Sequence, residues 1–390
     1  METRAKNKII KNFKKRFLQK NDQYLFDKIN LTKTNFGQKK YSVTKIVEKK
    51  SQILNGGHAL DLKSYLSLIV PHRFHKQLIK CNFFYLIRGE ETEALNFFKK
   101  KGCKIAVVIR NKYAKKRFER FLIGYNEYND ELYCSFYNIA GLQRLRHYEL
   151  LLKLIYGRVI NKKLYKVLYS NRYLKQLEKT VKSCCDAQKI IIGYKENVKK
   201  IIQKNYKQNP DINIEDDYFS LSYYHNERLI ITGHAFGWMI KEILSLIIHQ
   251  TKIKQLFYIG NCGALNNLKV GQIIFPNNLY CSTRRETAIN NILSPKNYNS
   301  ISHLSVSTPL VETNNFIIKN RKKFSTVDVE LYDIIRKTLD SKRKILLGVA
   351  LLVSDKPGRK ENGALVSDER RFQRSLNCVL EKIIKLALPK

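Results

Sequence analysis

The sequence lacks the patterns that build metal sites and membrane spans. Its eight cysteines form no CxxC pair, and the adjacent Cys184 and Cys185 are poorly placed to bind one metal ion together. This spacing argues against structural zinc, and we expect no metal and no cofactor. No apolar run approaches the roughly 18 residues that a membrane-spanning helix needs, so we expect no membrane span.

A recognisable targeting signal is also absent from the basic start METRAKNKIIKNFKKRF. This stretch carries Glu2 and lacks the serine enrichment of a transit peptide, and it does not resemble a secretory signal. We therefore expect reduced thiols in an intracellular, cytoplasmic protein, and import into an organelle stays open.

Acidic residues are scarce: there are 33 Asp and Glu against 73 Lys and Arg, a net charge of +40. More of this excess lies in residues 1–180 than in the rest of the chain. Such a balance favours polyanionic partners such as nucleic acid. The chain is also rich in residue types with AT-rich codons, so compositional bias is a second explanation for the charge.

A chain of 390 residues is longer than a single hydrophobic core usually supports. We therefore expect two domains, residues 1–182 and 186–390. Apolar positions at helical spacing (Ile9, Phe13, Phe17) predict a short amphipathic helix near the start. Residues 112–120, KYAKKRFER, interleave basic and aromatic side chains and are the best candidate for nucleic-acid contact, with a solvated helix face as the alternative.

The rest of the first domain predicts a basic, mainly helical α+β structure of unknown function. Residues 83–87 and 104–109 read as strands on either side of a helix at 90–101, and residues 142–180 form a long leucine-rich helical pattern. We identify no family resemblance for residues 1–182.

Residues 186–390 alternate between strand and helix patterns, which is typical of an α/β domain. The strand patterns lie at residues 188–193, 219–224, 228–232 and 345–353, and the helix patterns at 196–204, 238–249, 327–339 and 368–387.

Residues 256–276, LFYIGNCGALNNLKVGQIIFP, lie at the centre of this domain. The apolar run 256–259 predicts a buried strand, and residues 260–263 predict a turn before a second strand at 270–275. Because glycine has no Cβ, the backbone of this turn can approach an anion or a sugar closely. The alternative is a tight turn between core strands.

Polar groups follow three predicted strands: Gly233 with His234, residues 260–263, and Ser354 with Asp355. Ligands of α/β domains bind beyond the carboxyl ends of strands, so these groups predict one site. The motifs GHAFG, GNCGALNNLKVGQIIFP, TPLVET, VDVE and VSD occur in this order. Over residues 188–386 they resemble the nucleoside phosphorylase and nucleosidase superfamily, which includes the purine nucleoside phosphorylases.

The resemblance implies a three-layer α-β-α domain with a mixed central sheet, often in a homo-oligomer. Members cleave the N-glycosidic bond of nucleosides with phosphate or water. Asp355 matches the aspartate that protonates the purine at N7, with a turn cap as the alternative, and Glu330 matches the carboxylate that binds the ribose. The remaining implied site residues are His234 at the ribose; Gly233, Gly260, Asn261, Cys262 and Gly263 on the nucleophile side; and Val329, Ser354 and Val311 in the base pocket.

Some positions depart from the family pattern. Tyr258 and Asn261 stand where an arginine and a serine or threonine are usual, and residues 193–197 (GYKEN) lack the arginine common in phosphate-using members. Losing guanidinium groups removes bidentate phosphate contacts, which argues against phosphorolysis. Glu196 is a candidate for activating water, although its position is offset from the acidic run of the nucleosidases.

The sequence therefore predicts an enzyme that cleaves a purine-type nucleoside. Two alternatives stay open. The first is a catalytically inactive domain of this fold that binds nucleosides or acts as a scaffold. The second is a nucleic-acid-binding protein that acts through its basic first half.

Overall fold

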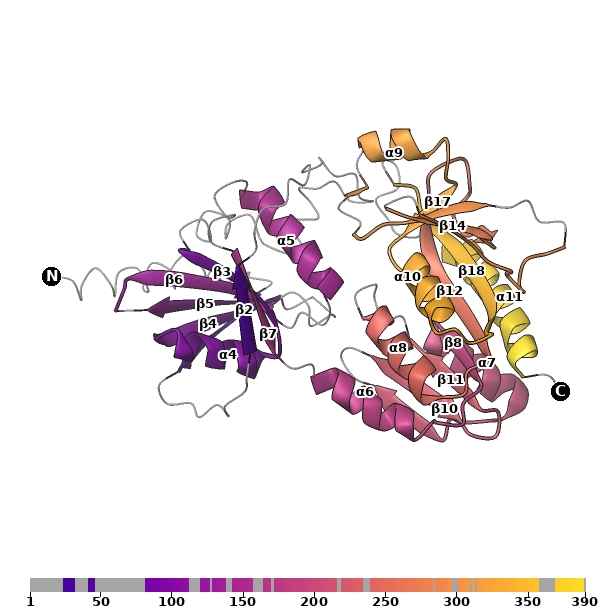
Figure 1. Ribbon diagram of the computed structural model, residues 1–390, viewed down its shortest axis with the longest axis horizontal. Coiled ribbons are helices and arrows are strands. Elements are labelled where there is room, and N and C mark those ends of the chain that lie inside the picture. Colours follow the sequence, from indigo (N-terminus) through magenta and orange to yellow (C-terminus); the bar gives the residue numbers. More distant parts are fainter. Residues whose placement is uncertain are drawn as a thin grey trace. The chain divides into compact units, whose positions relative to one another are not determined.

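The computed structural model divides into two compact units, each described by itself (Figure 1). Unit 1 comprises residues 1–46, 76–139 and 163–169, and unit 2 comprises residues 47–75, 140–162 and 170–390. The structure describes residues 24–31, 41–45, 81–111, 120–126, 128–137, 142–156, 164–169, 172–215, 219–233, 239–282, 285–296, 301–308, 311–312, 314–357 and 369–388. The domain boundary at 182–186 stays a prediction; residues 172–182 belong to unit 2.

Unit 1 is built on a seven-stranded sheet in the order β1-β4-β5-β6-β3-β7-β2. Its strands are β1 (Tyr24–Asn30), β2 (Tyr41–Lys45), β3 (Phe83–Arg88), β4 (Cys103–Asn111), β5 (Arg120–Asn126), β6 (Glu131–Phe136) and β7 (Leu164–Tyr169). Helix α4 (Glu91–Lys100) joins β3 to β4, as predicted, and buries Phe97 and Phe98 against Tyr85. Glu90 and Glu93 form a capping box at its start, so this acidic group has a structural role.

The expected mainly helical first domain is not confirmed, because the described part of unit 1 is mostly sheet. Its strands are rich in aromatic and β-branched residues, which fit a pleated, half-buried surface. The helical pattern predicted for residues 142–180 is interrupted by β7, which separates α5 (Leu142–Tyr156) from α6 (Arg172–Lys182).

Unit 2 contains a mixed sheet of eleven strands in the order β15-β14-β16-β17-β12-β8-β11-β10-β9, with β18 beside β12 and β13. The strands are β8 (Lys189–Ile192), β9 (Ile212–Glu215), β10 (Ser220–Tyr224), β11 (Leu229–Thr232), β12 (Gln255–Ala264), β13 (Ile273–Ile274), β14 (Asn278–Cys281), β15 (Glu286–Ala288), β16 (Ser302–Ser305), β17 (Thr326–Asp328) and β18 (Leu346–Asp355). The helices beside them are α7 (Lys195–Tyr206), α8 (Ile240–Gln250), α9 (Asn314–Asn320), α10 (Leu331–Asp340) and α11 (Glu369–Ala387).

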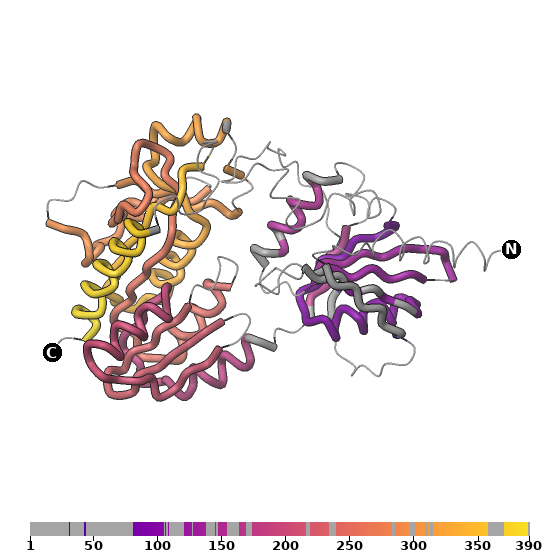
Figure 2. Tube along the Cα trace, turned by 180° about the vertical axis from the view of Figure 1, so that it is seen from behind, coloured from indigo at the N-terminus to yellow at the C-terminus, as the bar shows by residue number. Residues whose placement is uncertain are grey.

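The helices of unit 2 cover both faces of this sheet, which confirms the predicted three-layer α/β domain. Helices α7 and α11 contact one another behind the sheet, where Figure 2 shows them side by side, and α8 and α10 pack together on the other face. Val198 of α7 and Leu380 of α11 are fully buried in one cluster with Phe257 of β12 and Leu352 of β18. Burying each such side chain stabilises the fold by about 1.5–3 kcal/mol.

Strand β12 is the centre of unit 2, because it pairs with β8, β17 and β18. It continues through residues 260–263, so the turn predicted there is wrong. Neither Gly260 nor Gly263 has positive φ, whereas Gly271 does, at 79°. The second strand is shorter than the predicted range 270–275: only β13 (Ile273–Ile274) forms, after the turn at Gly271.

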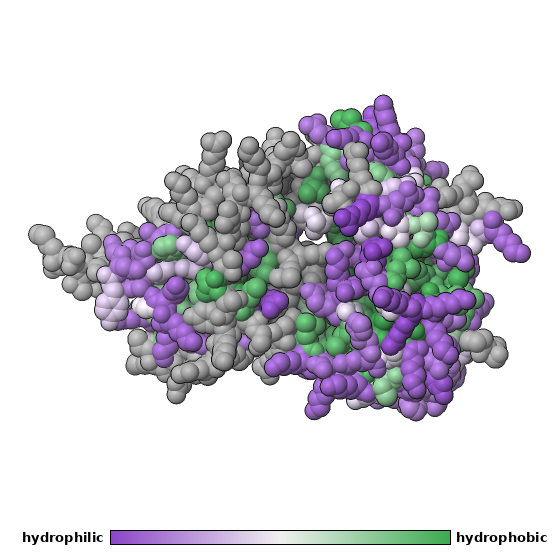
Figure 3. Space-filling model, in the orientation of Figure 1, coloured by the Kyte–Doolittle hydropathy of each residue, from purple (hydrophilic) through white to green (hydrophobic). Residues whose placement is uncertain are grey.

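On the face drawn in Figure 3, the described side chains of unit 2 are mostly hydrophilic, with hydrophobic patches between them. Within the described residues, no helix has the length and apolar character needed to cross a membrane. The amphipathic helix predicted at residues 9–17 and residues 112–119 of the basic stretch lie outside the described residues.

Candidate functional site

Two parallel strands of unit 2 place the predicted acid, Asp355, beside the glycine motif of residues 260–263. β12 and β18 run side by side from Gln255 and Leu346 until Gly263 pairs with Asp355. The register shifts between Cys262 and Gly263, which is a β-bulge of the kind often found beside active sites. Asp355 is therefore held at the carboxyl end of a central strand.

The side chains around this strand end are closely packed. The Ser354 hydroxyl lies 2.7 Å from the Asp355 carboxyl oxygen Oδ1 and 3.3 Å from the backbone oxygen of Cys262. Cys262 is 2% exposed, and burial, followed by Asp328 and Asp355, raises its thiol pKa well above the ordinary value. Cys262 is therefore a neutral buried thiol, which argues against nucleophilic catalysis by it.

The VDVE motif folds as the end of β17 followed by the start of α10, not as the predicted helix from residue 327. The buried Asp328 carboxyl accepts hydrogen bonds from the Ser305 hydroxyl (2.5 Å) and the backbone N–H of Leu331 (2.9 Å). His303 Nε2 lies 2.9 Å from the same carboxyl group. This network fixes the first turn of α10, whose N-cap is Glu330.

Glu312 is a buried acidic residue whose pKa responds to the other acids of this region. Its side chain is only 8% exposed and lies in a loop that precedes α9. Its pKa is raised well above the ordinary value, first by burial and then by Asp355, Asp328 and Glu330. Gly263 of β12 pairs with Asp355 of β18 and with Val327 of β17, so Asp355 and the VDVE motif, which ends at Glu330, follow the same end of β12.

Tyr258 lies beside this cluster, where phosphate-using members of the resembled family carry arginine. It is 2% exposed, and burial, followed by Glu330 and Asp328, raises its pKa well above the ordinary value. Its ring packs over Gly260, where an added Cβ would lie 2.4 Å from the phenol oxygen. Glycine at this position is therefore explained by the tyrosine ring, not by a ligand.

Replacing Gly260 with alanine should lower the free energy of unfolding by about 1–3 kcal/mol, because the buried Tyr258 ring must move. Chemical denaturation of the purified chain measures this loss. In a Tyr258→Ala background the same replacement should cost little; an equal loss in both backgrounds would contradict the steric explanation.

The residues predicted for the base pocket lie in two places. Val311 and Val329 pack against one buried cluster, which contains Leu265, Leu304, Val306, Phe324 and Val327. Ser354 is 4% exposed at the end of β18. The loop before Val311 is anchored at Thr308, whose hydroxyl lies 2.8 Å from Nδ1 of the buried His147 on α5.

The residues predicted for the nucleophile side lie on β12 and directly after β11. The Tyr194 hydroxyl donates a hydrogen bond to the side-chain oxygen of the exposed Asn261. Tyr194 has φ 48° and precedes α7, which it joins to β8 through Gly193. Gly233 lies directly after β11, and His234 lies outside the described residues.

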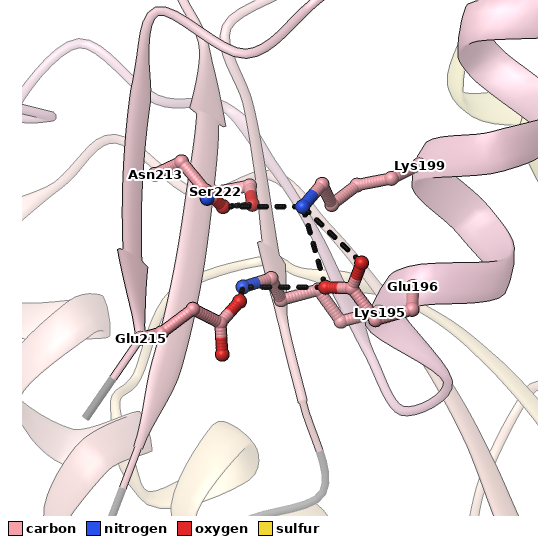
Figure 4. A network of polar contacts seen from close by, with 6 residues as sticks. All are labelled: Lys195, Glu196, Lys199, Asn213, Glu215 and Ser222. Atoms are coloured by element: carbon pink, nitrogen blue, oxygen red, sulfur yellow. Dashed lines mark hydrogen bonds and ion pairs between the residues drawn. The ribbon is translucent and has the colours of Figure 1, made fainter. Parts of the chain in front are cut away.

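Glu196 belongs to a different group of side chains (Figure 4). Its carboxylate lies 3.3 Å from Lys199 Nζ and 3.6 Å from Lys195 Nζ. Lys195, only 2% exposed at its side chain, also pairs with Glu215 of β9. Among described residues, Glu196 therefore contacts lysines near β9 rather than Asp355 or Glu330.

Reasoning from the sequence assigned no role to four residues near these strand ends. Glu312 belongs to the TPLVET motif and Asp328 to the VDVE motif, but neither residue was given a function. His303 belongs to no motif, and Tyr258 was noted only as a departure from the family pattern.

Comparison of the sequence with protein-family models and with curated proteins finds no match. Several solved structures are similar to about half of the chain. A 5′-methylthioadenosine/S-adenosyl homocysteine nucleosidase from Campylobacter jejuni is 13% identical, with 51% of this chain and 98% of that chain covered and a TM-score of 0.39.

A purine nucleoside phosphorylase from Toxoplasma gondii is 15% identical, with 53% and 93% of the two chains covered and a TM-score of 0.37. An AMP nucleosidase from Bacteroides thetaiotaomicron is 15% identical, with 55% and 99% covered and a TM-score of 0.36.

Proposed function

We propose that unit 2 hydrolyses the N-glycosidic bond of a purine nucleoside. The observation that supports this proposal is the pairing of Gly263 of β12 with Asp355 of β18 and with Val327 of β17, so that Asp355 and the VDVE motif follow the same end of β12. The cleavage needs one group that protonates the leaving base and one that holds the ribose, and we assign these roles to Asp355 and Glu330.

In this reaction the bond between C1′ of the ribose and N9 of the base breaks, and its electron pair moves into the base. Asp355 donates a proton to N7, so the base leaves as a neutral purine. Glu330 accepts hydrogen bonds from the ribose hydroxyls, and its negative charge stabilises the cationic sugar. The oxygen of water bonds to C1′ and loses a proton to solvent, giving free ribose, and a proton from solvent restores the acid form of Asp355.

Water, rather than phosphate, is the second substrate in this proposal. Tyr258 is a neutral phenol beside Glu330 and Asp328, where an arginine would hold phosphate. At the end of β8, Lys195 and Lys199 are paired with Glu215 and Glu196 (Figure 4). Lysines paired in this way offer little attraction to a phosphate dianion.

Release of free base from adenosine, inosine and methylthioadenosine tests the proposal. We expect release from at least one of them, at the same rate with and without phosphate, and with free ribose or methylthioribose as the other product. A sugar 1-phosphate product would contradict the use of water. Nucleoside binding without any release would favour an inactive domain of this fold.

A further inference from the structure

We infer that helix α5 is a working part of the nucleoside site, where its His147 is a positioning residue for the TPLVET loop, which begins at Thr308. The inference rests on the proposed function. It adds to that function a segment from outside residues 188–386, the range that resembles the family. Unit 2 includes residues 140–162 together with residues 170–390, so α5 and this loop belong to one compact unit.

The contact between α5 and the TPLVET loop is a buried hydrogen bond between two side chains. His147 Nδ1 lies 2.8 Å from the Thr308 hydroxyl, and each residue is 1% exposed. The two residues are 161 positions apart in the sequence. Because the interior offers no water to replace a lost partner, breaking this bond is costly. The bond therefore fixes the start of the loop on α5.

Helix α5 is a stable support for this anchor, because its apolar and its charged side chains are both buried. Leu145, Leu151 and Leu152 are at most 1% exposed. Glu149 and Lys153 form an ion pair at 2.8 Å, and both side chains are 3% exposed. Charges are removed from water only where packing holds them against a partner. These residues therefore mark α5 as a packed helix rather than a solvated one.

The loop that α5 holds lies beside the VDVE motif. The backbone N–H of Val306, just before the loop, donates a hydrogen bond of 2.8 Å to the backbone oxygen of Asp328. The N–H of Val311 donates to the backbone oxygen of Thr308 at 3.2 Å. Val311 also packs against the same buried cluster as Val329. A shift of Thr308 would therefore move a predicted base-pocket residue relative to the VDVE motif.

Hydrogen exchange of the full chain without substrate tests the anchor. Thr308→Val removes the hydroxyl at nearly constant volume, so exchange at the amides of Val306 and Val311 should become about tenfold faster. Thr308→Ser keeps a hydroxyl, and His147→Asn keeps a polar atom near the position of Nδ1. Both should exchange within about threefold of the wild type. Unchanged exchange in Thr308→Val would overturn the inference.

The kinetics of base release test the positioning role. A loosened loop lowers the fraction of molecules that are ready to bind, so Thr308→Val should raise KM about three- to tenfold and leave kcat within about twofold. Thr251→Val is the matched control. The Thr251 hydroxyl is similarly buried and donates a hydrogen bond of 2.7 Å to the backbone oxygen of Ile247, but it lies at the end of α8, before β12 begins. This control should lower stability and leave KM unchanged.

The outcomes separate positioning from general stability. Equal increases in KM for Thr308→Val and Thr251→Val would overturn the inference, because only stability would then matter. Combining His147→Ala with Thr308→Val should raise KM little more than either change alone, since the two side chains share one hydrogen bond. Fully additive increases would contradict a shared bond. If the wild type releases no base from any of the three nucleosides, the proposed function fails, and the exchange rates still decide whether α5 anchors the loop.

Discussion

Replacing Asp355 with asparagine should lower the rate of base release by about 10²–10⁴-fold. Asparagine has the same shape and can still accept the hydrogen bond from Ser354, but it cannot donate a proton to N7 as a carboxylic acid does. The release of hypoxanthine from inosine, followed under single-turnover conditions, measures the loss.

A substrate with an activated leaving group separates proton donation from a structural role. Nitrophenyl riboside releases a phenolate that needs no proton, so Asp355→Asn should reduce its hydrolysis far less than that of inosine. An equal reduction for both substrates would show that Asp355 acts on the fold or on the ribose. Glu196→Gln is the control, because the exposed Glu196 carboxylate pairs with Lys199 and the change should affect neither substrate.

Replacing Asp328 with alanine should lower the free energy of unfolding by about 3–5 kcal/mol. The change leaves the Ser305 hydroxyl, the backbone N–H of Leu331 and the buried His303 without their common acceptor. The first turn of α10 also loses its cap, so Glu330 should lose its fixed position. Denaturant unfolding measures the first effect, and weaker binding of a C-nucleoside analogue of adenosine, whose C–C bond is not cleaved, measures the second.

The matched control is Asp340→Ala at the other end of α10. Asp340 pairs with Arg336 at 2.9 Å, but both side chains are about half exposed, so the loss should stay below about 1 kcal/mol. If both replacements lowered the free energy of unfolding equally, the buried hydrogen bonds of Asp328 would not be the cause of the larger expected loss.

The order of elements in unit 2 could be predicted from the sequence because its strands are strongly apolar and end at polar residues. The β10–β11 hairpin, helix α8 and the long strand β18 lie where the patterns place them. Asp355 was found by the same logic, since a polar residue that ends a buried strand stands out.

The glycine motif could not be interpreted correctly from the sequence. Gly260 suggested a turn, yet it lies inside β12 because Tyr258, two residues earlier on the same face of the strand, needs the space of a missing Cβ. Such a contact depends on the direction of one ring, and composition and spacing do not contain that direction. The seven-stranded sheet of unit 1 was missed because its pairings join distant segments, such as β2 with β7.

Glu312 and His303 were missed for a related reason. A polar residue in a loop or a strand looks the same in the sequence whether it is solvated or buried. Only tertiary packing buries Glu312 and brings His303 to Asp328. The surroundings of these residues are therefore a property of the fold that no motif contains.

A crystal structure of the Asp355→Asn variant with intact inosine tests the central claim most directly. We predict that the base lies with N7 within hydrogen-bond distance of residue 355 and that the ribose hydroxyls contact Glu330. An inosine molecule bound elsewhere in unit 2, or bound here with its ribose away from Glu330, would contradict the account.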